Sequence, residues 1–307
     1  MNKNTIKKLK CPVCNSQSFD MDIDQKICDD ILFGRLLCQD CLTEYPIKDG
    51  ILQMIPNRKK DEGQQWDKVW RDTGLQITKR KIEKINQKRE TARTLYPPLE
   101  ISERLNLQYK ECLDIGCGSG SFSLALKKAG KISSAYLVDY SLQALYLAKG
   151  VYEYFGEQCE LIQGDARNLS FKDGSFGLSF STGLLEHFDK LSQETIIKEH
   201  CRVANDVICQ VPVSSVPYWI GRFLITVFNL KWPFSNEKPL SITKLKQLLI
   251  KTNYVVKDVS YHDMLTSICF FLSLKTKCIK PLGRKTFLNR LLRHEVAVYA
   301  LKIKQEA

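Results

Sequence analysis

The sequence predicts an α/β fold built on a parallel sheet, preceded by a small β-rich module, and three observations lead to this. From Tyr109 onward, short apolar runs alternate with helical patterns, which is typical of βαβ units. Residues 1–55 hold five cysteines, four of them in two close pairs, and two turn signals around short β-type segments. The length of 307 residues suits about two domains. We therefore expect domains at 1–56 and 109–307, joined by a helical connector or lid at 57–108.

A seven-stranded sheet with helices on both faces is expected in the second domain. The strands are expected at 111–115, 135–139, 160–163, 177–181, 206–211, 254–261 and 295–303. Two helices lie between them, at 121–129 before Gly130 and at 141–149, with Ser141 as N-cap and Gly150 as the stop. Ser241 should cap a helix through Leu249. The helices of the connector should stop at the Pro97-Pro98 pair.

The composition excludes several classes of protein. With 44% hydrophobic and 26% charged residues the chain is an average globular protein, which argues against disorder and long coiled coils. No stretch reaches the roughly 18 apolar residues of a spanning helix. The basic residues at the N-terminus have no apolar core behind them, so we expect no secretory signal and a cytoplasmic location.

Four of the 12 cysteines form two Cys-x-x-Cys pairs, Cys11 with Cys14 and Cys38 with Cys41, separated by 23 residues. Each pair places two thiolates on a tight turn, and two facing turns supply the four-sulfur shell that zinc prefers. Because a four-thiolate shell leaves no open position, the zinc would be structural. The alternative is a redox pair. Cys28 lies outside the pattern and should be ordinary packing.

The same segment resembles a known small protein. The two cysteine pairs, the run Tyr45-Pro46-Ile47-Lys48-Asp49-Gly50-Ile51 and the closing Met54-Ile55-Pro56 are similar to the zinc-ribbon activator of RNA and protein methyltransferases. The resemblance covers about the first 56 residues. It implies a zinc-ribbon domain that supports or docks a methyltransferase within the same chain.

A glycine-rich loop, Gly116-Cys117-Gly118-Ser119-Gly120, follows a predicted strand and opens a helix. Alternate glycines let a ligand lie directly against the main chain. A dinucleotide site would need a glycine where Ser121 stands, which weakens that interpretation. Asp139 ends the next strand and can accept the hydroxyls of a ribose in either kind of nucleotide.

Residues 109–211 resemble class I S-adenosylmethionine (SAM)-dependent methyltransferases, especially the group that includes quinone-biosynthesis enzymes. The motifs that carry the resemblance, in the order of the family, are 113–120, 138–141, 164–169, 171–176 and 183–188. The resemblance implies that Asp114, Gly116, Gly118 and Gly120 hold the methionine moiety, that Asp139 binds the ribose, and that Asp165 and Ala166 contact the adenine. Tyr140 packs on the adenine face or is simply a half-buried tyrosine.

Methyl transfer needs alignment of donor and acceptor and exclusion of water, with a base only when the acceptor loses a proton. The candidate catalytic residues are Glu186 and His187, which follow the fourth strand; a cofactor-orienting or helix-capping role is the alternative. His200, His262 and His294 are expected at the surface. Trp66 and Trp70, at i and i+4, either pack a helix on the core or belong to a lid over the cofactor.

The last third of the chain has 16 basic and 5 acidic residues, a net charge of +11 over 213–307. It holds an expected substrate cap (212–250) and an insert (264–293) in which an apolar run precedes seven cations. The insert suits peripheral contact with an anionic membrane at its inner face. The alternative is a solvated loop with one buried helix.

Three functions are open on this basis. The first is methylation of a small-molecule or lipid-like acceptor. The second is methylation of tRNA or rRNA, with RNA held by the zinc ribbon and the basic third of the chain. The third is a non-catalytic activator subunit that binds the cofactor. No DNA partner is expected.

Overall fold

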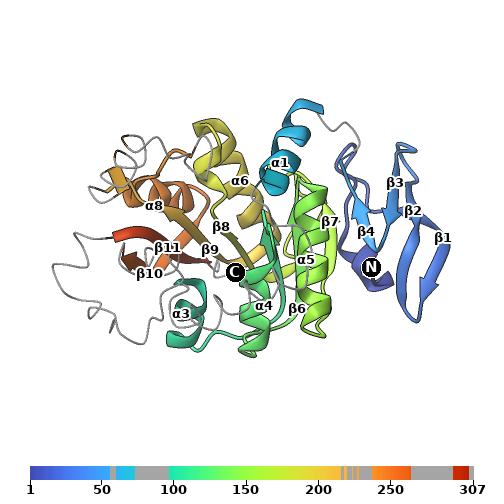
Figure 1. Ribbon diagram of the computed structural model, residues 1–307, viewed down its shortest axis with the longest axis horizontal. Coiled ribbons are helices and arrows are strands. Elements are labelled where there is room, and N and C mark those ends of the chain that lie inside the picture. Colours follow the sequence, from blue (N-terminus) through green and yellow to red (C-terminus); the bar gives the residue numbers. More distant parts are fainter. Residues whose placement is uncertain are drawn as a thin grey trace.

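The computed structural model describes residues 1–55, 60–72, 97–215, 218–219, 223, 227, 237–263 and 293–303. Within these residues the strands form one 11-stranded sheet, in the order β1-β2-β3-β4-β7-β6-β5-β8-β9-β11-β10. The sheet runs across the whole molecule, with the N-terminal strands at one end and β10 and β11 at the other (Figure 1). The α/β class is therefore confirmed.

Seven of the strands make the predicted sheet. They are β5 (Tyr109–Ile115), β6 (Ile132–Asp139), β7 (Glu160–Gln163), β8 (Phe176–Thr182), β9 (Ala204–Pro212), β10 (Tyr254–Asp263) and β11 (Arg293–Lys302). Strands β5 to β9 pair in parallel, whereas β11 is antiparallel to both β9 and β10. Because the chain order reverses at β5, the carboxyl ends of β5 and its neighbours open a crevice in which open α/β sheets bind ligands.

Helices cover both faces of this sheet (Figure 1). Their bounds are α1 Lys60–Asp72, α3 Pro97–Arg104, α4 Ser121–Lys128, α5 Leu142–Tyr154, α6 Lys190–Val203 and α8 Ile242–Ile250. Alternate residues of β5 supply two cores: Leu113 and Ile115 face the core that includes α6 and α8, while Cys112 faces that of α3, α4 and α5. This alternation is what a strand buried on both faces produces.

The N-terminal residues continue the same sheet. A 3-10 turn η1 (Lys3–Lys8) precedes β1 (Phe19–Ile27), β2 (Asp30–Cys38), β3 (Glu44–Lys48) and β4 (Ile51–Gln53). Strand β4 pairs in parallel with β7, Leu52 opposite Ile162. Leu9, Tyr45 and Leu52 share a hydrophobic core with Val138 and Phe171 of the larger sheet. The β module is thus built into the larger sheet, and the boundary at 56 stays a prediction.

Several local predictions are confirmed and others are wrong. Ser141 caps α5 by accepting from the Ala144 amide, and Ser241 caps α8. Gly150 does not stop α5, which continues to Tyr154 with Val151 and Tyr152 buried in the core. The Pro97-Pro98 pair begins α3, which suits proline because the first helical turn needs no amide donor. The expected end of the connector helices before this pair lies outside the described residues.

Two side chains lie where they were not expected. Cys28 is exposed at the turn between β1 and β2, with a φ of 52°, and is not packed. His200 on α6 is fully buried, not at the surface, and its Nδ1 lies 2.9 Å from the Ser179 hydroxyl. The side chains of His262 and His294 lie outside the described part of the chain.

The basic insert predicted at 264–293 lies outside the described residues except for Arg293, the first residue of β11. The expected cap at 212–250 is described in part. Within the described ranges, no helix is long and apolar enough to cross a membrane.

Candidate active site

A cavity of about 390 Å³ lies at the carboxyl ends of β5, β6, β7 and β8. Four short segments line it, one from each of these strand ends, and α1 contributes a fifth wall. The lining residues are Gln65, Trp66, Val69, Trp70, Gly116, Val138, Asp139, Tyr140, Gly164, Asp165, Ala166, Arg167, Gly183, Leu184, His187, Phe188, Asp189 and Ser192. Residues of the motifs 138–141, 164–169 and 183–188, which are far apart in the sequence, therefore line one cavity together with Gly116 of the glycine loop.

The glycine loop has the backbone conformation that its sequence predicts. Gly116, Gly118 and Gly120 have φ values of 68°, 52° and 65°, a region that favours glycine. A Cβ on Gly118 would lie 2.5 Å from the Trp70 ring, and one on Gly116 would lie 2.7 Å from Leu184. The loop thus needs glycine both for its turn and for the close approach of side chains above it.

Asp139 faces the glycine loop. Its Oδ2 accepts a hydrogen bond of 2.9 Å from the Gly118 amide, and its Oδ1 accepts one of the same length from the Ser141 amide. The side chain is buried, and burial raises the pKa of Asp139 to about 6, although both amide donors oppose this rise. At neutral pH the carboxylate is charged and lines the cavity.

Asp114 lies beneath the loop and is not among the residues that line the cavity. Its Oδ2 accepts a hydrogen bond of 2.7 Å from the Ser123 hydroxyl, which fixes the first turn of α4 against β5. Its Oδ1 is buried without a partner among the described residues. Burial raises the pKa of Asp114 to about 7. In this geometry Asp114 supports the loop from behind.

The segment after β7 brings Asp165 and Ala166 into the cavity, together with a residue that sequence reasoning missed. The Arg167 side chain forms an ion pair with Asp165, its terminal nitrogen 2.8 Å from Oδ2, and the Arg167 amide also donates to Oδ1. The Arg167 guanidinium lies 5.8 Å from the centre of the Phe188 ring. Its position directly after the Gly164-Asp165-Ala166 run was the signal that could have identified it.

His187 and Glu186 lie on a short 3-10 turn, η2 (Leu185–His187), after β8. His187 reaches the cavity, and burial lowers the pKa of His187 to about 4, so the imidazole is neutral at pH 7. Glu186 is buried and does not line the cavity. Of the two candidate catalytic residues, only His187 is placed to contact a bound molecule.

Helix α1 covers the cavity. The Trp66 ring packs edge-on against the His187 ring, with centroids 5.1 Å apart, and Trp70 lies over Gly118. The Ser141 hydroxyl donates a 2.7 Å hydrogen bond to the Asp67 carboxylate, which ties the helix to the end of β6. Trp66 and Trp70 therefore line the cavity, and Trp70 also packs against the core that includes α4 and α5, so both interpretations of the tryptophan pair have support.

The four predicted cysteines form a second site, in the N-terminal module. The sulfur atoms of Cys11, Cys14, Cys38 and Cys41 all lie within 4.8 Å of one another. Asn15 and Leu42, which follow the two pairs, have positive φ values, so each pair sits on a tight turn. Four clustered thiols on two facing turns fit a tetrahedral zinc shell with Zn–S bonds of about 2.3 Å.

Comparison with known proteins assigns the domain that contains the larger sheet to a family. Residues 112–206 match the family model of the methyltransferase domain. The chain carries a methyltransferase domain. This domain is of the SAM-dependent methyltransferase type. No curated protein matches the sequence.

One solved methyltransferase structure shows the same fold, and two further structures are similar at lower scores. Magnesium protoporphyrin IX methyltransferase from Synechocystis is 12% identical, with a TM-score of 0.52, and the match covers 78% of this chain and 96% of that protein. A SAM-dependent methyltransferase from Methanosarcina mazei is 22% identical, with a TM-score of 0.49, over 69% and 99% of the two chains. A methyltransferase-like protein from Bacillus halodurans is 16% identical, with a TM-score of 0.48, over 66% and 97%.

Proposed function

We propose that the methyltransferase domain transfers the methyl group of SAM to a small-molecule or lipid-like acceptor held beneath α1. The observation that carries this proposal is the meeting of Asp139, the glycine loop and His187 in one cavity covered by Trp66 and Trp70. When bound, SAM supplies a methyl group already activated on a sulfonium.

Different residues of the cavity are proposed to bind different parts of SAM. Gly116 lines the cavity and offers a backbone against which the methionine moiety can lie, while Gly118 and Gly120 shape the loop. Asp139 offers a carboxylate to the ribose hydroxyls. Asp165 and Ala166 are placed for the adenine. A mouth lined with carboxylates suits a ligand that carries a sulfonium and an ammonium, because opposite charges attract most strongly where water is partly excluded.

The wall after β8 suits the acceptor. Leu184, His187 and Phe188 line it together with Trp66 of the lid, so it is largely apolar. Apolar walls with a few polar groups are typical of sites for small organic ligands. His187 is neutral at pH 7 and can accept a proton from an acceptor hydroxyl or amine, although its lowered pKa makes it a weak base.

A lipid-like acceptor has further support in the described part of the cap. Trp219, Phe223 and Val227 are all more than half exposed and recur every four residues, the spacing of one helix face. Exposed apolar side chains at this spacing suit contact with an acyl chain or a membrane surface.

Four thiolates in the N-terminal module would hold one zinc ion, and its role would be structural. A four-sulfur shell has no position for a substrate. Zinc there would fix the two turns that carry the cysteines and, through them, the fold of β1 to β4.

The test is an activity screen with methyl-labelled SAM against separated lipid, small-molecule and RNA fractions of the source cell. We expect label in the lipid or small-molecule fraction and none with the Asp139→Ala variant. Label found only in RNA, and weakened by salt, would replace this proposal with the RNA methyltransferase alternative.

A further inference from the structure

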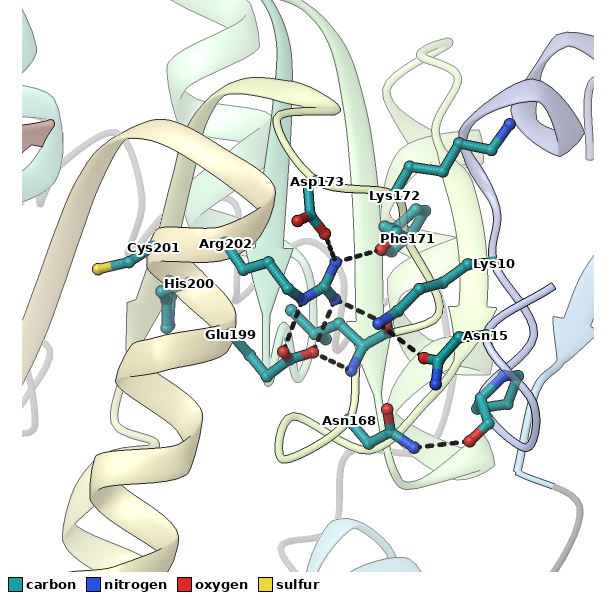
Figure 2. A network of polar contacts seen from close by, with 12 residues as sticks. Lys10, Asn15, Asn168, Phe171, Lys172, Asp173, Glu199, His200, Cys201 and Arg202 are labelled. Atoms are coloured by element: carbon teal, nitrogen blue, oxygen red, sulfur yellow. Dashed lines mark hydrogen bonds and ion pairs between the residues drawn. The ribbon is translucent and has the colours of Figure 1, made fainter. Parts of the chain in front are cut away.

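The segment that carries Asp165 and Ala166 into the cavity is held between the four-cysteine site and α6. We call residues 164–169 the adenine loop. Figure 2 shows this region, with the N-terminal module on one side of the loop and the side chains of α6 on the other. The loop itself is a tight turn, closed by a 2.9 Å hydrogen bond from the Asn168 amide to the Asp165 carbonyl.

The N-terminal module contacts the loop and the residues that follow it through its backbone. The Asn168 side-chain amide donates a 2.9 Å hydrogen bond to the carbonyl of Pro12 (Figure 2). Next to it, the Lys10 amide donates to the Ser170 carbonyl at 3.1 Å, and the Lys172 amide donates to the Lys8 carbonyl at 2.8 Å. This ladder fixes residues 8–12 against residues 168–172.

Helix α6 holds the loop from the other side. Glu199 accepts a 2.7 Å hydrogen bond from the Leu169 amide, and Arg202 donates to the Leu169 carbonyl at 3.0 Å (Figure 2). Arg202 also donates to the Phe171 carbonyl and pairs with Asp173 and Glu199. Both side chains are mostly buried, so these charged hydrogen bonds are among the stronger ones in the molecule.

Pro12 lies inside the first cysteine turn, between Cys11 and Cys14. The turn is closed by a 2.9 Å hydrogen bond from the Asn15 amide to the Cys11 carbonyl, and Cys11 is fully buried. Any metal bound by Cys11 and Cys14 therefore fixes the direction of the Pro12 carbonyl. That carbonyl is the acceptor for Asn168, three residues after Asp165.

We propose that Asn168 is a positioning residue through which the metal-bound cysteine turn orders the adenine loop, so that zinc and the adenosyl cofactor each favour the binding of the other. This inference rests on the proposed function, because it takes residues 164–169 to be the adenine side of the SAM site. Coupling between two binding sites is reciprocal, so it has to appear in both affinities.

The first test measures binding of S-adenosylhomocysteine (SAH) by calorimetry to the zinc-loaded full chain and its Asn168→Ala variant. Loss of one side-chain hydrogen bond should weaken SAH binding about five-fold, at unchanged zinc content. The matched control is Gln39→Ala, which removes an exposed hydrogen bond to Asp20 from the second cysteine turn, away from the adenine loop. The control should bind SAH as the wild type does.

The second test follows zinc release to a chromogenic chelator with and without saturating SAH. SAH should slow release from the wild type and from Gln39→Ala, and should have a smaller effect on Asn168→Ala. Equal SAH affinity in wild type and Asn168→Ala, together with zinc release that ignores SAH, would overturn the coupling while the proposed function stands. If the zinc-loaded wild type binds no SAH at all, the proposed function itself fails.

Discussion

Among the single residues of the site, Asp139 has the most central position. It uses one carboxylate oxygen on the glycine loop and the other on the first turn toward α5. Each oxygen keeps further lone pairs for a ligand. The same carboxylate that shapes the loop can therefore also bind the ribose, which links loop conformation to cofactor binding.

The pH dependence of cofactor binding should report this carboxylate. Because the pKa of Asp139 is raised to about 6, its charged form is lost as the pH falls below 6, and SAH affinity should fall by about ten-fold at pH 5. Calorimetry from pH 5 to 8 would measure this. In Asp139→Asn, affinity should be low and should no longer decrease below pH 6.

Glycine at position 118 should be required for ligand binding and not only for folding. A Cβ in Gly118→Ala would lie 2.5 Å from the Trp70 ring, so the lid has to move and SAH affinity should fall at least about ten-fold. Gly130→Ala is the matched control, because its φ of 68° is similar but no atom lies within 4 Å of the added carbon.

Both glycine variants should lose about 1–2 kcal/mol of folding free energy from the left-handed backbone alone. Thermal denaturation together with SAH titration separates the two effects. Equal SAH affinity in Gly118→Ala and Gly130→Ala would contradict the role given to Trp70.

The sequence predicted the residues whose roles follow from the backbone. Gly118 and Asp139 could be found because a glycine-rich turn after a strand and an acid at the next strand end have a fixed geometric relation. The burial of His200 could not be predicted from the sequence, because it depends on how α6 packs over Ser179. The ion pair of Arg167 with Asp165 was missed because many local conformations would leave an arginine in solvent.

Among the elements, α1 decides how closed the site is. The helix has two tryptophans one turn apart, a pattern that in the sequence fitted both a core helix and a lid. In the structure the pair does both, since Trp66 contacts His187 and Trp70 contacts the glycine loop while also packing against the neighbouring core. Spacing alone could not decide this, because it fixes the helix face and not what that face meets.

Opening this lid should change the titration of His187. The pKa of His187 is lowered to about 4 by burial alone, so Trp66→Ala should admit water and raise it to above about 5. NMR titration of the imidazole carbons would show this. His200, whose pKa burial lowers to about 3, is the internal control and should not move.

The sign of the stability change follows from the same values. Burial makes His187 harder to protonate in the folded state than in the unfolded state. Above the unfolded pKa of about 6.5 this does not reduce the free energy of unfolding, because the imidazole is neutral in both states. As the pH falls from 6.5 toward 4, the unfolded state binds the proton first and folding stability is lost. Trp66→Ala should reduce that loss. An unchanged His187 titration would contradict the assignment of α1 as its cover.

For the whole molecule, the main feature is that the four-cysteine module and the methyltransferase domain share one sheet. The sequence predicted both parts and their order along the chain, but not the pairing of β4 with β7. That pairing joins residues over 100 positions apart, such as Leu52 and Ile162, and only tertiary structure selects it.

A shared sheet and a shared core predict a single unfolding transition. In calorimetry the zinc-loaded chain should unfold in one cooperative step, because Leu9, Tyr45 and Phe171 belong to one core. Chelation should lower the midpoint of that step as a whole, by at least about 5 °C. Two separate transitions, with only the first sensitive to chelator, would show that the module folds independently.

We propose that the cavity between α1 and the carboxyl ends of β5 to β8 binds the adenosyl cofactor. A crystal structure of the zinc-loaded chain grown with SAH would show whether it does. We predict the ribose hydroxyls at Asp139, the adenine beside Asp165 and Ala166, and the homocysteine against the glycine loop. SAH bound elsewhere, or an empty cavity at saturating SAH, would contradict the claim.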